Sequence, residues 1–69
     1  MNSDTPLYVI VDERGVKLAY PTLTEAEESL TSDLPAQAIR PTTFGQLLKT
    51  DRHALVHVQL QYYWAEDLA

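Results

Sequence analysis

The chain contains no cysteine, only two glycines and only five lysine or arginine residues among its 69 residues. Without cysteine it can form neither a disulfide nor a thiolate zinc site, and it lacks a thiol nucleophile. Two isolated glycines, Gly15 and Gly45, cannot build the glycine-rich loop that cradles phosphate groups. No serine lies in a Gly-x-Ser-x-Gly turn. These absences predict a protein that is not an enzyme and uses no cofactor.

The length predicts one small domain that spans residues 1–69. Domains of this size have marginal cores and are usually reinforced by disulfides, metals or oligomerisation. Because disulfides are excluded, we expect a homodimer or a bound partner. No stretch approaches the roughly 20 apolar residues of a membrane span, and residues 1–20 do not resemble a signal peptide. We therefore expect a cytoplasmic protein with no membrane partner.

The charge balance is acidic, because ten aspartate and glutamate residues against five lysine and arginine residues give a net charge of −5. Phosphate contacts need clustered cations, so this excess argues against direct binding to nucleic acid. Residues 18–39 contain no lysine or arginine but four acids: Glu25, Glu27, Glu28 and Asp33. We interpret these acids as a docking surface for a basic or mixed protein surface. The alternatives are an ordinary solvated helix face and a mimic of DNA.

A β-hairpin is predicted for residues 7–20, where two runs of β-forming residues flank the turn sequence Asp-Glu-Arg-Gly. Aspartate suits the first position of a type I turn and glycine the fourth. A plain four-residue loop pairs Val11 with Val16, whereas a bulge with Gly15 in the left-handed region pairs Asp12 with Val16. The two registers bury opposite faces, and both stay open at this point.

Two capping boxes predict helices. The first starts at Thr22, with Thr24 as an equally acceptable cap, and precedes a narrow apolar stripe that predicts a helix over about 23–33. The second starts at Thr43 and predicts a short helix over about 44–50.

The strongest pattern in the chain is the alternation over residues 54–64. One parity carries Ala54, Val56, Val58, Leu60, Tyr62 and Trp64, and the other includes His57, Gln59 and Gln61. Because strand side chains alternate between faces, this pattern predicts one long, half-buried strand. The predicted fold is therefore α+β: a small three-stranded, mostly antiparallel sheet, made of the hairpin 7–20 and the long strand 54–64, with one or two helices on one face.

A strand over residues 54–64 would extend about 35 Å at roughly 3.3 Å per residue, much further than either hairpin strand. Its unpaired half would expose backbone N–H and C=O groups, which is an aggregation hazard. We therefore predict that it pairs with a second copy, with His57, Gln59 and Gln61 along the joint, or that it captures a partner's strand. A bent strand that pairs only within its own chain is the alternative.

The aromatic run at 62–64 suggests a contact surface, since tyrosine and tryptophan are common in interface hot spots. On a strand, Tyr63 points to the face opposite its neighbours Tyr62 and Trp64, and Leu55 lies on the same face as Tyr63. We predict that Tyr63, Leu55 and Trp64 contact a partner, although Trp64 fits the core equally well.

His53 and His57 are four residues apart, a spacing that suits a metal site on a helix. On a strand they would lie roughly 13 Å apart, which is too far to share one ion. We expect two surface histidines and no metal site.

In its size, acidity and lack of cysteine and catalytic residues, the chain is similar in type to the small orphan proteins that phages and mobile elements use to inhibit bacterial proteins. This resemblance implies a non-enzymatic inhibitor or modulator of another, bacterial host, protein. Two alternatives are a DNA mimic that competes with nucleic acid for a DNA-binding protein, and a homodimeric structural or assembly subunit.

Overall fold

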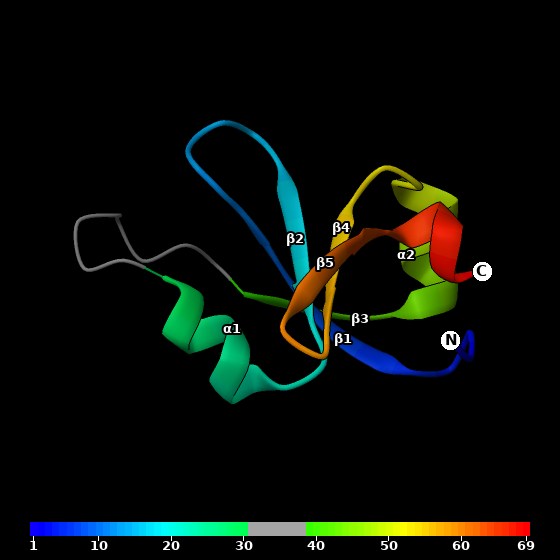
Figure 1. Cartoon of the computed structure of the whole chain (residues 1–69), viewed down its shortest axis with the longest axis horizontal. Coiled ribbons are helices and arrows are strands. Elements are labelled where there is room, and N and C mark those ends of the chain that lie inside the picture. Colours follow the sequence, from blue (N-terminus) through cyan, green and yellow to red (C-terminus); the bar gives the residue numbers. More distant parts are fainter. Residues whose placement is uncertain (31–38) are drawn as a thin grey trace.

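The computed structural model describes residues 1–30 and 39–69. Within these ranges one five-stranded sheet has the order β3-β1-β2-β4-β5 (Figure 1). The strands are β1 (Pro6–Val11), β2 (Lys17–Tyr20), β3 (Arg40–Thr43), β4 (Leu55–Val58) and β5 (Gln61–Trp64). The helices are α1 (Leu23–Ser29), α2 (Phe44–Thr50) and the short 3₁₀ helix η1 (Ala65–Leu68). All neighbouring strands are antiparallel except β2 and β4, which run parallel.

The fold is α+β, but the predicted three-stranded, mostly antiparallel sheet is wrong: the sheet is five-stranded and mixed, β3 adds an edge strand, and a turn interrupts the predicted strand 54–64. Gln59 and Leu60 have φ values of 51° and 68°, so they form a tight two-residue turn between β4 and β5. Positive φ at both central residues is the mark of a type I′ turn, which normally carries Asn-Gly or Asp-Gly. Gln-Leu gives no such signal, and the alternation of the sequence continues across the turn.

The turn also changes which side chains share a face. Cross-strand partners of an antiparallel pair point to the same side of the sheet. The registered pairs are Leu55 with Trp64, Val56 with Tyr63, His57 with Tyr62 and Val58 with Gln61. Tyr62 and Trp64 therefore lie on the opposite face from Val56, not on the same face as predicted. Leu55 likewise joins Trp64 rather than Tyr63.

The N-terminal hairpin adopts the second of the two registers considered. Gly15 has a φ of 85°, and the Asp12 amide donates to the Val16 carbonyl at 3.0 Å. The Asp12 carboxylate accepts hydrogen bonds from the backbone amides of Val16 and Arg14, both at 2.9 Å. These bonds, the one from Val16 first, hold the pKa of Asp12 below its usual value.

The helices cover both faces of the sheet, which corrects the prediction that they lie on one face. We call these the α2 face and the α1 face. The core under α2 and η1 comprises Leu7, Ala19, Phe44, Leu47, Ala54, Val56 and Ala65. The core under α1 comprises Ile10, Tyr20 and Ala26. Strand β1 contributes to both cores, which explains why its sequence is apolar on both parities.

Both helices begin at the predicted caps. The Thr22 hydroxyl accepts a hydrogen bond from the Glu25 amide at 3.1 Å, and the Thr43 hydroxyl accepts one from the Gln46 amide at 3.2 Å. Helix α2 occupies the predicted range, whereas α1 ends at Ser29, because Leu30 is already extended. The rest of the predicted helix 23–33 lies outside the described residues. Within the described ranges, no helix has the length and apolarity needed to cross a bilayer.

Candidate functional site

The sheet has two edge strands, and β3 is the protected one. In an antiparallel pair, residues that exchange hydrogen bonds alternate with residues whose backbone groups point away. The Phe44 amide donates to the Thr5 carbonyl at 2.9 Å, and this spacing places Pro41 and Thr43 among the outward-pointing residues of β3. Proline has no N–H to offer, and proline at an edge strand discourages pairing with another chain.

The other edge strand, β5, keeps its donors. The Ala65 amide donates to the Ala54 carbonyl at 2.8 Å, so the alternation turns the backbone groups of Tyr62 and Trp64 away from β4. Trp64 is also the N-cap of η1, and its carbonyl accepts the first bond of that helix. The N–H and C=O of Tyr62 and the N–H of Trp64 therefore face outward, at an edge without protection by proline.

Exposed apolar side chains concentrate on the same hairpin. Seven large hydrophobic residues are exposed among those described, and four of them fall within residues 60–64: Leu60, Tyr62, Tyr63 and Trp64. Leu60, at the turn, is 89% exposed. Single exposed apolar residues are ordinary, but a cluster of this kind marks a contact surface.

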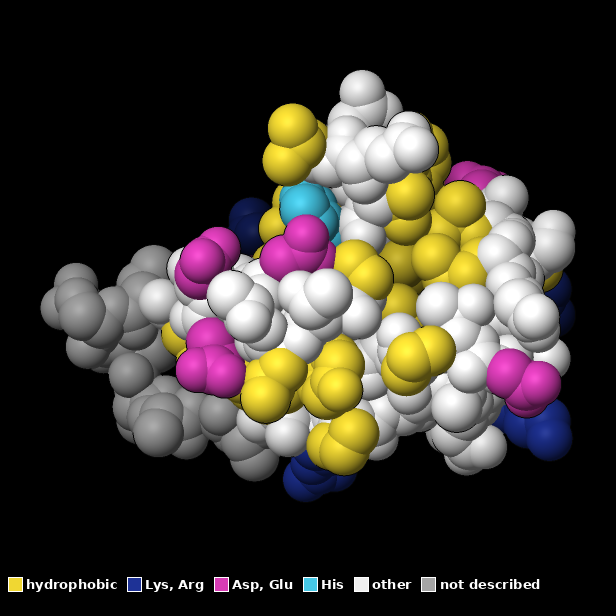
Figure 2. Space-filling model, turned by 90° about the horizontal axis from the view of Figure 1, so that it is seen from below, with side chains coloured by type: hydrophobic (Ala, Val, Ile, Leu, Met, Phe, Trp, Pro, Cys, Tyr) yellow, Lys and Arg dark blue, Asp and Glu magenta, His cyan; other side chains and the backbone are white. Residues whose placement is uncertain are grey.

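The predicted acidic surface lies on the α1 side of the molecule. Glu27 and Glu28 are exposed on α1, while Glu25 is half-buried and its Oε2 atom has no hydrogen-bond partner in the described part of the chain. Figure 2 shows acidic side chains gathered beside a histidine and several apolar side chains. The fourth predicted acid, Asp33, lies outside the described residues.

Aromatic rings hold Tyr62 in place on the α1 face. The His57 ring lies 5.0 Å from the Tyr62 ring, and the Tyr20 ring meets Tyr62 edge-on at 6.2 Å. The hydroxyls of Tyr20 and Tyr62 form a hydrogen bond of 2.8 Å. Burial of the Tyr62 hydroxyl end, and then this bond, raise the pKa of Tyr62 to about 12. Since 47% of Tyr62 is nevertheless exposed, it offers a fixed aromatic surface to a partner.

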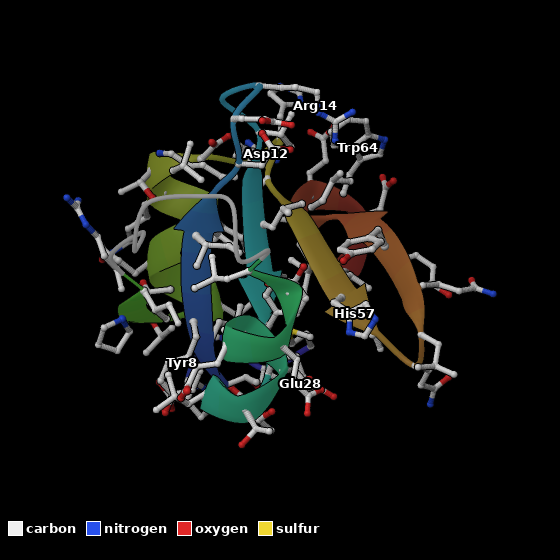
Figure 3. All side chains as sticks on the ribbon, turned by 90° about the vertical axis from the view of Figure 1, so that its left-hand side faces the viewer. Tyr8, Asp12, Arg14, Glu28, His57 and Trp64 are labelled. Atoms are coloured by element: carbon white, nitrogen blue, oxygen red, sulfur yellow. The ribbon has the colours of Figure 1, made fainter. Side chains whose placement is uncertain are left out.

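Trp64 is the second half-exposed ring on this face. Its indole meets the His53 ring edge-on at 6.3 Å, and His53 Nδ1 lies 3.6 Å from Glu66 Oε1. Figure 3 shows Trp64 at one end of the β4–β5 hairpin, with His57 nearer the other end and Glu28 on α1 beside it. The acidic helix and these two half-exposed rings of β5 therefore both lie on the α1 face.

The residues predicted to line a dimer joint are not brought together. His57 lies on β4, which is paired on both sides, and Gln59 lies in the turn. Gln61 opens β5 on the α2 face, where its Oε1 accepts a hydrogen bond from the Tyr63 hydroxyl at 2.8 Å. Tyr62, which the sequence did not single out, is the residue with both backbone groups at the open edge.

Comparison with known proteins gives no match to a family model, a curated protein or a solved structure. The described residues contain no group of three side chains arranged to hold a metal ion.

Proposed function

We propose that the protein is a non-enzymatic binding module that receives an extended segment of another protein along β5. The observation that carries this proposal is the contrast between the two edges: Pro41 removes a donor from β3, whereas Tyr62 and Trp64 keep theirs on β5. Strand addition to an open sheet edge is a common mode of peptide recognition. Main-chain hydrogen bonds hold the added strand, and side chains beside them select it.

The aromatic side chains contribute more to such binding than the backbone does. Tyr62 and Trp64 are 47% and 48% exposed. Burying the exposed half of each ring removes about 100 Å² from water, which corresponds to about 2–3 kcal/mol before association costs. A backbone hydrogen bond adds a net of about 1 kcal/mol. Affinity therefore depends first on the rings, and strand orientation depends on the backbone.

The acids of α1 lie on the same face and support a partner with a basic or mixed surface. Complementary charge raises association rates more than affinity. Replacing Glu27 and Glu28 by glutamine is expected to slow association and to weaken its dependence on salt. Glu13→Gln, in the turn between β1 and β2, is the matched control. Unchanged kinetics in the α1 variant would remove the acids from the binding surface.

The resemblance in type to the small inhibitors of phages and mobile elements supports the partner class: we infer an inhibitor or modulator that acts on a bacterial host protein in the cytoplasm. If the protein instead mimics DNA, added duplex DNA will displace the bound partner. Displacement of the partner by duplex DNA therefore distinguishes a DNA mimic from an inhibitor of another kind.

Trp64 provides a test of strand addition, because its φ of −62° already matches proline. Trp64→Ala removes the ring and keeps the N–H, whereas Trp64→Pro removes both without straining the chain. Immobilised wild-type protein should capture a protein from bacterial lysate, the alanine variant less of it, and the proline variant least. Val11→Ala, which removes an exposed apolar group elsewhere, should capture as the wild type does. No captured protein, or equal capture by the two Trp64 variants, would exclude strand addition.

A second candidate function is assembly of two copies through β5. Both backbone groups of Tyr62 point outward, so a two-fold axis beside this residue lets two copies exchange a pair of hydrogen bonds. Light scattering on the purified chain is the test. A dimer that Trp64→Pro converts to a monomer supports this assembly, and a monomeric wild type excludes it.

A further inference from the structure

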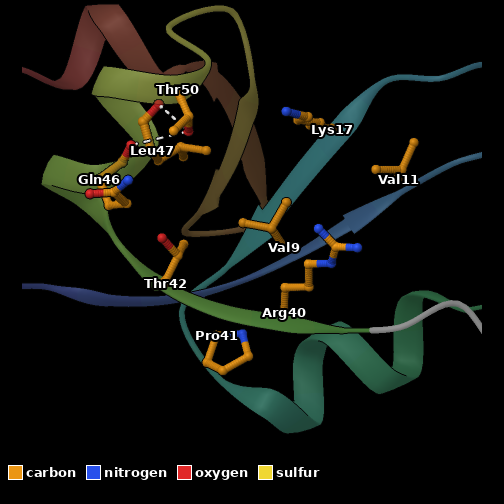
Figure 4. A pocket seen from close by; sticks show the side chains of 9 residues that line it. All are labelled: Val9, Val11, Lys17, Arg40, Pro41, Thr42, Gln46, Leu47 and Thr50. Carbon is orange, nitrogen blue, oxygen red and sulfur yellow. Dashed lines mark hydrogen bonds between the residues drawn. The ribbon is translucent and has the colours of Figure 1, made fainter.

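A second candidate site lies on the other side of the sheet. A cleft of about 480 Å³ opens on the α2 face, between α2 and the strands β1, β2 and β3 (Figure 4). Its lining comprises Val9, Val11, Lys17, Arg40, Pro41, Thr42, Gln46, Leu47 and Thr50. Small-molecule sites typically occupy roughly 300–1,000 Å³, so the cleft suits a ligand at the small end of that range. Neither Tyr62 nor Trp64 lines it, so it is separate from the proposed strand-binding edge.

The cleft concentrates positive charge in an acidic protein. Of five lysine and arginine residues it takes Lys17 and Arg40, and no acid from the described part of the chain lines it. Lys17 Nζ lies 3.6 Å from a carboxylate oxygen of Asp51, which offsets much of its charge. Arg40 forms no ion pair with any residue that the structure describes. Its guanidinium is therefore the one cationic group of the cleft that is available to a ligand.

An apolar surface lies beside this guanidinium. Arg40 and Val9 are registered partners on neighbouring strands, and their side chains rise into the same space in Figure 4. Val11 is 40% exposed, and Leu47 of α2 forms the facing wall. The Thr50 hydroxyl already donates to carbonyls of α2 at 3.1 and 3.4 Å, so it presents no free donor. The cleft thus combines one strong anion-binding group with an apolar wall.

We propose that this cleft binds a small amphipathic monocarboxylate, with its carboxylate on Arg40 and its hydrocarbon chain against Val9, Val11 and Leu47. A planar guanidinium matches a carboxylate with two parallel hydrogen bonds. A phosphate dianion fits less well, because it would meet a single available cation in a protein of net charge −5. The apolar wall distinguishes the ligand from a simple inorganic anion.

Three probes test the contributions of the carboxylate and of the hydrocarbon chain separately. Each is titrated into the full chain while the amide chemical shifts are monitored. Hexanoate carries both the charge and the chain, hexan-1-ol carries only the chain, and inorganic phosphate carries only charge. We expect saturable shifts at Val9, Val11 and Thr42 with hexanoate, and at least tenfold weaker binding of the other two probes. Equal binding of hexanol or phosphate, or no saturable shift with hexanoate, would overturn the proposal.

Variants assign the carboxylate to Arg40. Arg40→Gln is expected to weaken hexanoate binding about tenfold or more, since a hydrogen bond to a charged group is lost. Arg40→Lys keeps the charge without the planar fork and should bind with intermediate affinity. Arg52→Gln removes an exposed cation that does not line the cleft and should bind hexanoate as the wild type does. Equal losses in the Arg40→Gln and Arg52→Gln variants would show a general effect of charge and would refute the site.

Discussion

Replacing Gln59 by asparagine and Leu60 by glycine tests the turn that divides the predicted long strand. Both residues have positive φ, at 51° and 68°, and neither is of a type that favours it. Leu60 is 89% exposed, so its loss removes almost no buried surface. The double variant changes the backbone preference at the turn and little else.

The expected gain follows from the cost of left-handed backbone. An ordinary L-residue loses roughly 1–2 kcal/mol in this conformation. Glycine removes that cost at Leu60, but it loses more backbone entropy on folding, which cancels about 0.5–1 kcal/mol of the gain. Asparagine tolerates the conformation better than glutamine does at the other position. The net stabilisation is about 1 kcal/mol, which for a domain of this size raises Tm by about 4–8 °C.

Thermal and urea unfolding, followed by circular dichroism and Trp64 fluorescence, measure the change. Gln61→Asn is the matched control, because it makes the same substitution one residue into β5, where asparagine is disfavoured. It should leave Tm unchanged or slightly lower. A continuous strand would give the opposite sign for the double variant, since glycine inside a strand is destabilising. A lower Tm for the double variant would therefore refute the hairpin.

Two further predictions concern contacts between residues far apart in the sequence. Because the pKa of Tyr62 is raised from 10.0 to about 12, the folded state holds this proton more tightly, and stability should fall as pH rises from about 10 to 12. Tyr20→Phe should lower the pKa of Tyr62 in an ultraviolet titration and weaken that loss; an unchanged titration would contradict the Tyr20 contact. Gly45→Ala should destabilise the full chain, although alanine normally favours a helix, because the added Cβ would lie 2.9 Å from Ser3 Cβ. In a chain without residues 1–4, Gly45→Ala should instead raise the free energy of unfolding measured in urea. A full-length Gly45→Ala protein that is more stable than the wild type would show that the segment at Ser3 moves easily to accept the added Cβ.

The parts of the fold that were predicted correctly have local chemical signals. The hairpin over 7–20 has a turn sequence with Gly15 at its end, and each helix has a threonine cap whose hydroxyl accepts the expected bond. These features depend on neighbours within a few residues, which is why the sequence alone reveals them.

The parts that were missed depend on contacts between distant segments. Strand β3 has the sequence Arg-Pro-Thr-Thr, in which only the two threonines favour a strand and the proline opposes one, and it forms because β1 lies beside it. The parallel pairing of β2 with β4 has no sequence signature at all. In the candidate site, Tyr62 was assigned to the core face because the turn at 59–60 was not recognised. One missed turn thus inverted the predicted faces of the β5 residues.

The junction between β2 and β4 is the shortest strand pairing in the sheet, and it separates a unit of three N-terminal strands from a unit formed by the C-terminal hairpin. The registered pairs Leu18–Leu55 and Ala19–Val56 join these two units, and the hydrogen bond between the Tyr20 and Tyr62 hydroxyls and the core under α2 also cross the junction. Amide exchange through partial opening is therefore expected to begin at this seam, with each unit still paired internally. A strand bound at β5 would protect one unit, and a carboxylate in the cleft would protect the other. The two ligands can thus influence each other through the contacts that cross this junction.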